Sequence, residues 1–329
     1  QLTSVSSAAL AGVTNVENLQ VTSAATVSLA SDLSFDSIDL KTSTSSESVT
    51  FTTGYLKATT VSVEGGDSVT NTGADIVLTV TADSDDLAAA DNTMLTGSDK
   101  TGVINTLNVT NTTGTIDMAS TGDIGGFDVL NVLDHTSTTG NDVTVNLASY
   151  ASALTLNAST LDSGEVLTIS GQSAKALNVT GGAGADVLAL GVGADTIDGG
   201  AGNDTFTAGT SITYADTLTG GAGTDTMTAT DIADIDLTNV TGIETLTVAG
   251  TTAAASLGAQ ASAAGIATVN TTSGTNQTVD AAAMTTNVTF VAGGADIETI
   301  TGGTGDDTFV FQATESLLYT DVLNGTSGD

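Results

Sequence analysis

Aspartates recur at a fixed spacing in one glycine-rich stretch of the chain, residues 181–207. The stretch divides into three nonapeptides, GGAGADVLA, LGVGADTID and GGAGNDTFT. Each has an aspartate at its sixth place (Asp186, Asp195 and Asp204) and a large apolar residue at its eighth. Glycine tolerates positive φ and so permits a tight turn. We therefore expect each carboxylate to point into such a turn, and each apolar residue to point inward from a short strand.

This spacing favours a coiled chain in which two nonapeptides make one full coil, so that carboxylates of successive coils stack on the same edge. Farther along the block there is an insertion around residues 208–213, which we interpret as a bulge in one turn. Stacked carboxylates and turn carbonyls together form an all-oxygen cage, which suits calcium and fits magnesium or zinc poorly. The expected pairs are Asp186 with Asp204, Asp195 with Asp216, and Asp204 with Asp225.

The candidate calcium ligands are the acids and glycines of these turns and of a second glycine-rich block near residue 300, and several ions are expected. The alternative interpretation is a series of glycine turns with solvated aspartates. The candidates are Gly182, Gly184, Asp186, Gly193, Asp195, Gly200, Gly202, Asp204, Asp216, Gly221, Gly223, Asp225, Glu298, Gly303, Gly305, Asp307 and Asp321.

These nonapeptides resemble the calcium-binding repeats of the RTX (repeats-in-toxin) proteins. The copies that start at residues 181, 199, 220 and 302 fit closely, and the rest of the chain lies mostly outside the resemblance. The resemblance implies export by a type I secretion system of a Gram-negative bacterium in an unfolded, calcium-free state. Folding would then follow when the chain meets calcium outside the cell.

Composition narrows the possible functions. The chain has 38 acids, four lysines and no arginine, for a formal net charge of −34. Nucleic-acid binders need a cationic surface, and anionic membranes would repel this chain, so neither is an expected partner. Self-repulsion of this size opposes a compact state, and divalent cations would offset it. No apolar run is long enough to span a membrane.

The chain as a whole is typical of all-β proteins. Alternating apolar and polar residues predict strands at 106–110, 142–147, 153–158 and 287–292. A hexamer of the pattern apolar–acid–x–apolar–x–apolar recurs as VENLQV (16–21), FDSIDL (35–40), FDVLNV (127–132) and IETLTV (243–248). The absence of proline suits a long regular stack of strands. Short helices are expected only at 83–95 and 253–265.

We therefore predict a parallel β-solenoid or β-roll with calcium-binding Gly/Asp turns, joined to strand-rich sandwich or solenoid modules. Glycine content suggests four parts: strand-rich modules at 1–180, the nonapeptide roll at 181–228, a strand-rich module at 229–292, and a second, incomplete nonapeptide block at 293–329. The chain begins with Gln1 and ends within a repeat-like stretch, so we expect a piece of a longer protein.

No enzyme is expected in this chain. Its single histidine, His135, cannot supply a zinc-protease motif, and we interpret it as a polar loop residue. The nearest approach to a nucleophile elbow, SGQSAK (170–175), lacks the last glycine. Paired carboxylates could in principle hydrolyse glycosides, but the chain has no tryptophan and only four tyrosines to form a sugar platform.

A structural role is the preferred prediction. The stretches 15–21, 242–248 and 280–307 resemble type I-secreted surface-layer (S-layer) proteins, in which calcium joins subunits into a sheet over the outer membrane. We expect self-assembly at the surface of a Gram-negative cell, with lipopolysaccharide a possible anchor through a region that the sequence does not locate. The alternative is an adhesin, stalk or extracellular filament. Surplus acids such as DSDD (83–86) would bridge subunits through calcium, unless they form only a solvated turn.

Overall fold

The computed structural model divides into two compact units, Gln1–Lys175 and Ala176–Asp329. Each unit is described by itself. The structure describes residues 4–5, 13, 16–21, 25–30, 33–40, 46–52, 55, 57–64, 67–71, 77–83, 87, 94–97, 104–110, 114–118, 124–134, 142–148, 150–171, 173, 175–292, 298–311 and 321–326.

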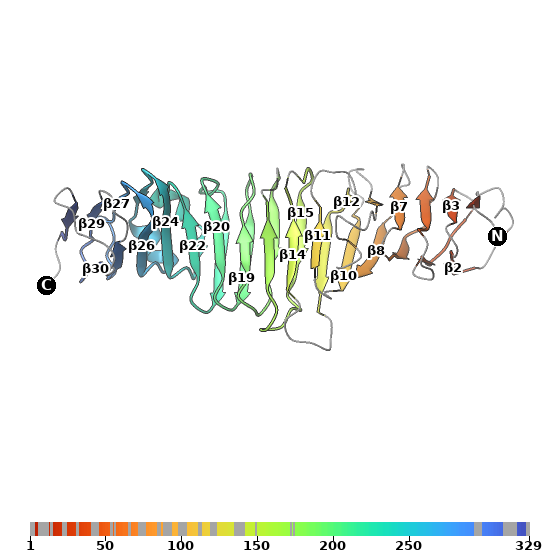
Figure 1. The fold of residues 1–329 in the computed structure, drawn as a ribbon, viewed down its shortest axis with the longest axis horizontal. Coiled ribbons are helices and arrows are strands. Elements are labelled where there is room, and N and C mark those ends of the chain that lie inside the picture. Colours follow the sequence, from red (N-terminus) through yellow and green to blue (C-terminus); the bar gives the residue numbers. More distant parts are fainter. Residues whose placement is uncertain are drawn as a thin grey trace. The chain divides into compact units, whose positions relative to one another are not determined.

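In the first unit the chain winds back and forth between parallel sheets, and each strand pairs with the strand one coil farther along (Figure 1). One sheet has the order β1 (Ser4–Val5), β3 (Thr26–Leu29), β5 (Ser48–Phe51), β7 (Ser68–Asn71), β9 (Met94–Thr96), β12 (Ile124–Gly125). A second has β2 (Asn18–Gln20), β4 (Ser37–Asp39), β6 (Thr59–Ser62), β8 (Leu78–Asp83), β10 (Thr106–Thr110), β13 (Val129–Leu133), β15 (Leu154–Asn157). A third has β11 (Gly114–Asp117), β14 (Val143–Asn146), β16 (Leu167–Ser170).

The second unit winds in the same way. One set of neighbours is β17 (Leu177–Thr180), β19 (Thr196–Ala201), β21 (Thr217–Ala222), β23 (Val240–Thr241). The next is β18 (Val187–Ala189), β20 (Thr205–Gly209), β22 (Thr226–Ala229), β24 (Thr245–Thr251), β26 (Thr268–Thr275), β28 (Thr289–Ala292), β30 (Thr308–Phe311). A smaller sheet has β25 (Ala254–Ser256), β27 (Thr278–Asp280), β29 (Thr299–Thr301), β31 (Val322–Asn324).

Every strand pair among the described residues is parallel, so the strand-rich parts are solenoid coils rather than sandwiches, and the predicted β-solenoid is confirmed. Paired positions are separated by 18 residues in the first nonapeptide coils. The separation rises to 29 residues where β11 pairs with β14. Coils of different length are therefore accommodated between strands that still pair in parallel.

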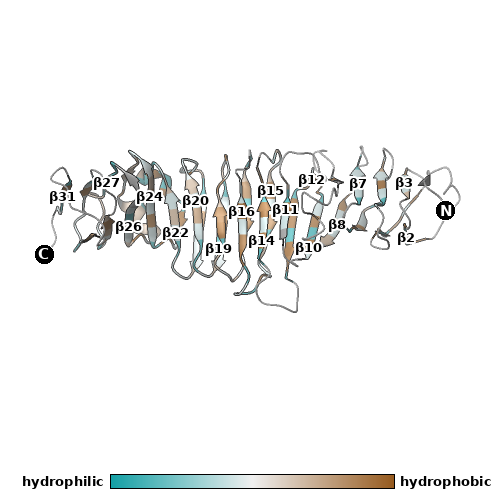
Figure 2. Ribbon diagram, viewed as in Figure 1, coloured by the Kyte–Doolittle hydropathy of each residue, from teal (hydrophilic) through white to brown (hydrophobic). Residues whose placement is uncertain are grey.

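Hydrophobic and hydrophilic residues alternate along the strands (Figure 2), and the hydrophobic ones are mostly buried. In the second unit the stacked residues of one sheet form a continuous column that is buried as far as Phe290 and ends in two stacked phenylalanine rings, those of Phe290 and the half-buried Phe309. The column is Leu188, Phe206, Met227, Leu246, Val269, Phe290 and Phe309. Burial of one such column per sheet is the main stabilising contribution in a solenoid.

The predicted strands are confirmed, whereas the two predicted helices are wrong over most of the residues that the structure describes. The strands expected at 106–110, 142–147, 153–158 and 287–292 are β10, β14, β15 and β28. In the expected helix at 253–265, only Ala259–Ala264 is helical (α1), because Ala254–Ser256 pairs as β25. The helix expected at 83–95 is wrong at both ends, which lie in β8 and β9, and most of its middle lies outside the described residues.

The division between the two compact units falls between residues 175 and 176, and the boundary at 180 suggested by glycine content stays a prediction. The finer division at 228 and 292 remains a prediction, since it concerns glycine content rather than packing. The second unit also holds a short 3₁₀ helix, η2 (Asp234–Leu237). None of the helices in the part of the chain that the structure describes could cross a membrane.

Candidate metal centre

The aspartates of the nonapeptides lie at the corners of the coils, where each directly precedes a strand. On one edge, Asp186, Asp204 and Asp225 precede β18, β20 and β22, and all three side chains are buried. The backbone N–H of Asp186 donates to Oδ1 of Asp204 over 2.8 Å. The N–H of Asp204 donates in the same way to Oδ1 of Asp225, also over 2.8 Å. The predicted stacking of these aspartates is confirmed.

The second edge repeats the arrangement on the other side of the coil. Asp195 and Asp216 precede β19 and β21, and both are buried. The N–H of Leu177 donates to Oδ1 of Asp195, and the N–H of Asp195 donates to Oδ1 of Asp216, each over 2.8 Å. Each carboxylate therefore holds the backbone of the preceding coil, which explains why its spacing follows the coil length.

The insertion around 208–213 is accommodated as predicted, by a bulge. The strand register between β20 and β22 shifts between Thr207 and Gly209. Beyond it, the turn is closed by Thr213, whose N–H donates to Oδ2 of Asp216 over 2.7 Å. Across the insertion, the paired aspartates on both edges are separated by 21 residues instead of 18. Each carboxylate still accepts the backbone N–H of its partner in the preceding coil.

The second carboxylate oxygens fall into two groups. Some accept an N–H of their own turn: Gly182 donates to Oδ2 of Asp186 over 2.7 Å, and Gly191 donates to Oδ2 of Asp195 over 2.9 Å. In contrast, Oδ2 of Asp204 and Oδ2 of Asp225 are buried without any hydrogen-bond partner. A buried carboxylate oxygen without a partner is costly, so these two atoms favour a bound cation or a proton.

Both orphan oxygens lie against a glycine, Oδ2 of Asp204 beside Gly199 and Oδ2 of Asp225 beside Gly220, and the hydrogen-bonded Oδ2 of Asp186 lies in the same way beside Gly181. At Gly199, the point where a Cβ would stand lies within 2.6 Å of both Oδ2 of Asp204 and the carbonyl oxygen of Gly220. At Gly181, the corresponding point lies within 2.6 Å of Oδ2 of Asp186 and the carbonyl oxygen of Gly199. Carboxylate and carbonyl oxygens, the ligand types that calcium prefers, are thus gathered on the same side of each glycine.

Five other glycines of these turns are required by backbone geometry, whereas the candidates Gly182, Gly184, Gly303 and Gly305 are not among the glycines with positive φ. The positive φ angles of these five are ones that residues with a side chain rarely adopt. At Gly200 and Gly202 a Cβ would also collide with the carbonyl groups of Gly182 and Gly184 in the preceding coil. The predicted glycines with positive φ are Gly193 (150°), Gly200 (99°), Gly202 (123°), Gly221 (105°) and Gly223 (147°).

Burial also raises the pKa values of these carboxyl groups. The pKa of Asp204 rises to about 7, first because the group is buried and then because the charges of Asp186 and Asp225 lie nearby. Burial likewise raises the pKa of Asp195 and of Asp225, and neighbouring carboxylates at Asp216 and Glu244 add to it. The metal-free edge therefore holds protons more readily than exposed aspartates do, and a bound cation would displace them.

The C-terminal candidates show part of the same pattern. Oδ2 of Asp307 accepts the N–H of Gly303 over 2.7 Å, and its Oδ1 accepts the N–H of Val288 over 3.0 Å. Glu298 is buried, and its N–H donates to Oδ1 of Asp321 over 3.2 Å. Gly305 lies against the carbonyl group of Thr286. The turn at 293–297 lies outside the described residues.

The sequence prediction did not include acids outside the nonapeptides that take the same place in the coil. Asp128 and Glu244, the second residues of two hexamers, directly precede β13 and β24. They accept the N–H groups of Asn105 (2.9 Å) and Asp225 (2.8 Å) in the preceding coil. The sequence did contain a pattern that could have identified them. In both the hexamer and the nonapeptide, an acid is followed two residues later by an apolar residue.

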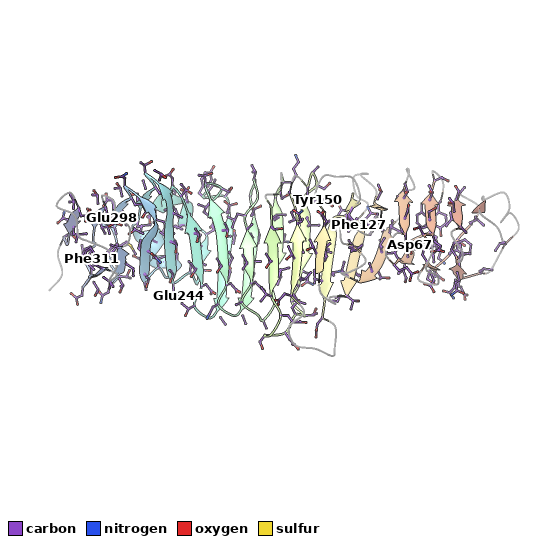
Figure 3. The ribbon with its side chains drawn as sticks, viewed as in Figure 1. Asp67, Phe127, Tyr150, Glu244, Glu298 and Phe311 are labelled. Atoms are coloured by element: carbon purple, nitrogen blue, oxygen red, sulfur yellow. The ribbon has the colours of Figure 1, made fainter. Side chains whose placement is uncertain are left out.

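Two further acids of this kind, Glu47 and Asp67, precede β5 and β7 in the first unit and are buried (Figure 3 labels Asp67 and Glu244). Oδ1 of Asp67 accepts the N–H of Glu47, and its Oδ2 accepts the N–H of Glu64, each over 2.9 Å. Burial raises the pKa of Asp67 to about 7. No glycine nonapeptide marks this corner, so only the structure identifies it.

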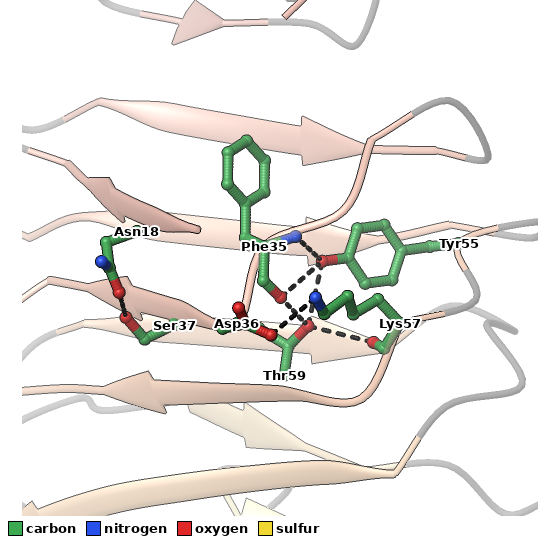
Figure 4. A network of polar contacts seen from close by, with 7 residues as sticks. All are labelled: Asn18, Phe35, Asp36, Ser37, Tyr55, Lys57 and Thr59. Carbon is green, nitrogen blue, oxygen red and sulfur yellow. Dashed lines mark hydrogen bonds and ion pairs between the residues drawn. The ribbon is translucent and has the colours of Figure 1, made fainter. Parts of the chain in front are cut away.

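One hexamer acid is neutralised by a lysine. Nζ of Lys57 lies 2.6 Å from Oδ1 of Asp36, on the exposed side of a network around Phe35 (Figure 4). Inside the same network, the hydroxyl of Tyr55 accepts the N–H of Phe35 over 3.0 Å, and the hydroxyl of Thr59 donates to the carbonyl oxygen of Phe35 over 2.9 Å. At this corner the hexamer coil is therefore stabilised by side-chain hydrogen bonds, whereas the nonapeptide coils have a glycine turn at the same place.

The donor set of the nonapeptide edge favours calcium. Within the described ranges, no three acidic or histidine side chains gather closely enough to hold a metal ion by themselves. A mixed set of carboxylate and backbone carbonyl oxygens, as around Gly199, is one that calcium accepts. When bound, the ion would neutralise the buried carboxylates and cross-link successive turns. His135, by contrast, lies outside the described residues.

Comparison with known proteins agrees with this geometry. The family described as RTX calcium-binding nonapeptide repeat (4 copies) matches residues 179–210, 213–231 and 292–310. No curated protein matches the chain, and no solved structure does. The matched segments contain both aspartate edges and the Gly303–Asp307 turn. The chain is therefore a β-solenoid that carries RTX-type calcium-binding nonapeptide repeats.

Proposed function

We propose that this chain is a secreted structural protein whose folding depends on calcium and which self-assembles into a layer at the cell surface. RTX repeat proteins are typically secreted and extracellular. The observation that carries the proposal is the pair of buried, unpartnered oxygens on Asp204 and Asp225, which face glycine carbonyls inside the coil itself. Metal binding and coil formation are then the same event.

Charge supports the link between calcium and assembly. A net charge of −34 with four lysines makes neighbouring copies repel one another. Divalent cations between surface carboxylates would reverse that repulsion. The partner is accordingly a second copy of the chain on the surface of a Gram-negative cell, and lipopolysaccharide remains a candidate anchor. Of the bridging candidates at 83–86, Asp83 ends β8 and the others lie outside the described residues. We propose no catalytic activity.

The second candidate function is an adhesin or stalk that binds a surface ligand. One open groove of about 460 Å³ in the second unit favours it. Three carboxylates, from Asp231, Asp236 and Asp280, line this groove beside the apolar side chains of Ile232 and Ala255. A groove of this composition would suit a cationic ligand rather than a second acidic chain.

The deciding experiment is a calcium titration of EDTA-treated protein, followed by circular dichroism, light scattering and electron microscopy of the same samples. Calcium-dependent β-structure followed by ordered sheets or filaments would support the surface layer. A compact monomer that folds in calcium but never assembles would favour the adhesin. If calcium changed neither the fold nor the particle size, the calcium-dependent function would be refuted. Magnesium at the same ionic strength is the control.

A further inference from the structure

The series of glycine-edge spaces continues beyond the nonapeptides. Beside Gly220, the point where a Cβ would stand lies 2.5 Å from Oδ2 of Asp225 and 1.7 Å from the carbonyl oxygen of Gly242, so both oxygen atoms lie against this glycine. The same pair of atoms, a carboxylate oxygen of the turn and a carbonyl of the next coil, surrounds the spaces beside Gly181 and Gly199. However, Gly242 belongs to a hexamer coil, and the family match does not cover residues 232–291.

The hexamer coil is held in place by the same hydrogen bond that links the nonapeptides. The N–H of Asp225 donates to Oε2 of Glu244 over 2.8 Å, as the N–H of Asp204 donates to Asp225. The strands before the two turns are in register, with Thr219 opposite Thr241. The turn at 242–244 is thus a shortened version of the turn at 220–225, with Gly242 beside Gly220 and Glu244 beyond Asp225.

An independent feature points to a ligand at this place. The side chain of Asp225 is fully buried, and its Oδ2 has no hydrogen-bond partner. Gly242 has φ of 66°, the left-handed region that glycine favours. Its carbonyl oxygen lies against Gly220, as Oδ2 of Asp225 does. Two oxygen atoms, one of them on a buried carboxylate without a hydrogen-bond partner, therefore approach the same position beside Gly220.

We propose that a calcium ion binds here, between the last nonapeptide turn and the hexamer coil. Asp225 and the carbonyl of Gly242 are its ligands, and Glu244 is a positioning residue that holds Asp225 through the backbone. The inference rests on calcium binding by the nonapeptide turns. It extends the metal-stabilised edge into a part of the chain with no nonapeptide, and it links the RTX block to the strand-rich coils that follow.

The test compares two substitutions of Gly242 in the full chain by equilibrium dialysis against calcium-45. Asparagine tolerates positive φ and valine does not, so Gly242→Asn keeps the carbonyl direction and Gly242→Val moves it. We expect Gly242→Asn to bind as many ions as the wild type and Gly242→Val to bind one fewer. The Asp225→Asn/Gly242→Val double variant should lose no more ions than Asp225→Asn alone, since both changes affect one ion.

A second pair of variants, at Glu244, keeps the test decisive if Gly242→Val fails to fold. Glu244→Gln keeps an oxygen that can accept the N–H of Asp225, whereas Glu244→Ala does not, so only the alanine variant should lose the ion. Circular dichroism in excess calcium checks that each variant is folded. Equal ion counts for Gly242→Val and Gly242→Asn would overturn this inference alone. A wild type that binds no calcium would overturn the proposed function as well.

Discussion

The substitution Asp204→Asn should change stability in opposite directions with and without calcium. Asp204 is buried, its Oδ1 accepts the N–H of Asp186, and its Oδ2 has no partner. An asparagine keeps an acceptor oxygen for that N–H but removes the negative charge. Without calcium, the buried negative charge destabilises the folded state. With calcium, the carboxylate binds the ion and stabilises the folded state.

The magnitude follows from the pKa. In the metal-free protein the pKa of Asp204 is raised from 3.8 to about 7. A group whose pKa is raised on folding stabilises the fold fully below its unfolded pKa, and this stability is lost as the pH rises through the folded pKa. A shift of this size corresponds to ~4 kcal/mol. Screening by solvent at a coil edge reduces it to ~2 kcal/mol.

In EDTA, wild type and variant should therefore unfold at similar temperatures at pH 4. At pH 8 the variant should be more stable by ~2 kcal/mol, which is about 5 °C in a unit of this size. In calcium at a hundred times its dissociation constant, each bound ion adds ~2.7 kcal/mol. The variant loses that ion and should unfold at a lower temperature than the wild type.

Thermal unfolding followed by circular dichroism at both pH values, in EDTA and in calcium, measures all four cases. Asp198→Asn is the matched control, because Asp198 is an exposed acid of the same coil. It should change the midpoint little in any buffer. If Asp204→Asn destabilised the protein equally in EDTA and in calcium at pH 8, Asp204 would be only a hydrogen-bonding residue, and the assignment of its orphan oxygen to calcium would be refuted.

Three further predictions test other parts of the structure. Gly199→Ala places a Cβ between Asp204 and Gly220 and should abolish the calcium-induced rise in melting temperature, whereas Gly125→Ala, in open space, should leave it unchanged. Tyr150→Phe removes a buried hydroxyl that donates to the carbonyl of Phe127 over 2.7 Å, and should reduce the free energy of unfolding by about 1–3 kcal/mol; Tyr214→Phe, at an exposed tyrosine, should have no effect. In metal-free protein, carboxyl NMR should show Asp67 titrating near pH 7, so this corner loses stability as the pH rises through 7; titration near 4 would contradict its burial.

The nonapeptides could be interpreted from sequence alone because their spacing, turn chemistry and strand pattern agree. Glycines with positive φ, an acid at the sixth place and an apolar eighth residue all require the same coil, and the structure places Asp186 and Asp204 as that coil demands. The insertion before Asp216 was also recognisable, since the regular spacing resumes after it.

The corners outside the nonapeptides could not be assigned in this way. Glu47 and Asp67 lie in coils whose loops differ in length, so no fixed spacing relates them, and their role depends on a register that only the folded sheets reveal. The overextended helix prediction at 253–265 has a similar cause. Its alanines suit a helix by propensity, but pairing with Thr278–Asp280 takes Ala254–Ser256 into a sheet.

The hydrogen bonds of the aspartate edges run in a single direction along the stack. Asp186, Asp195 and Asp204 each give their N–H to a carboxylate of the following coil, and Asp225 does the same toward Glu244. Removing one carboxylate therefore strands an amide in the coil before it, not in the coil after it. The loss of one carboxylate therefore weakens the neighbouring coil on its N-terminal side. Conversely, each coil that folds on the C-terminal side completes the hydrogen bonds of the coil before it.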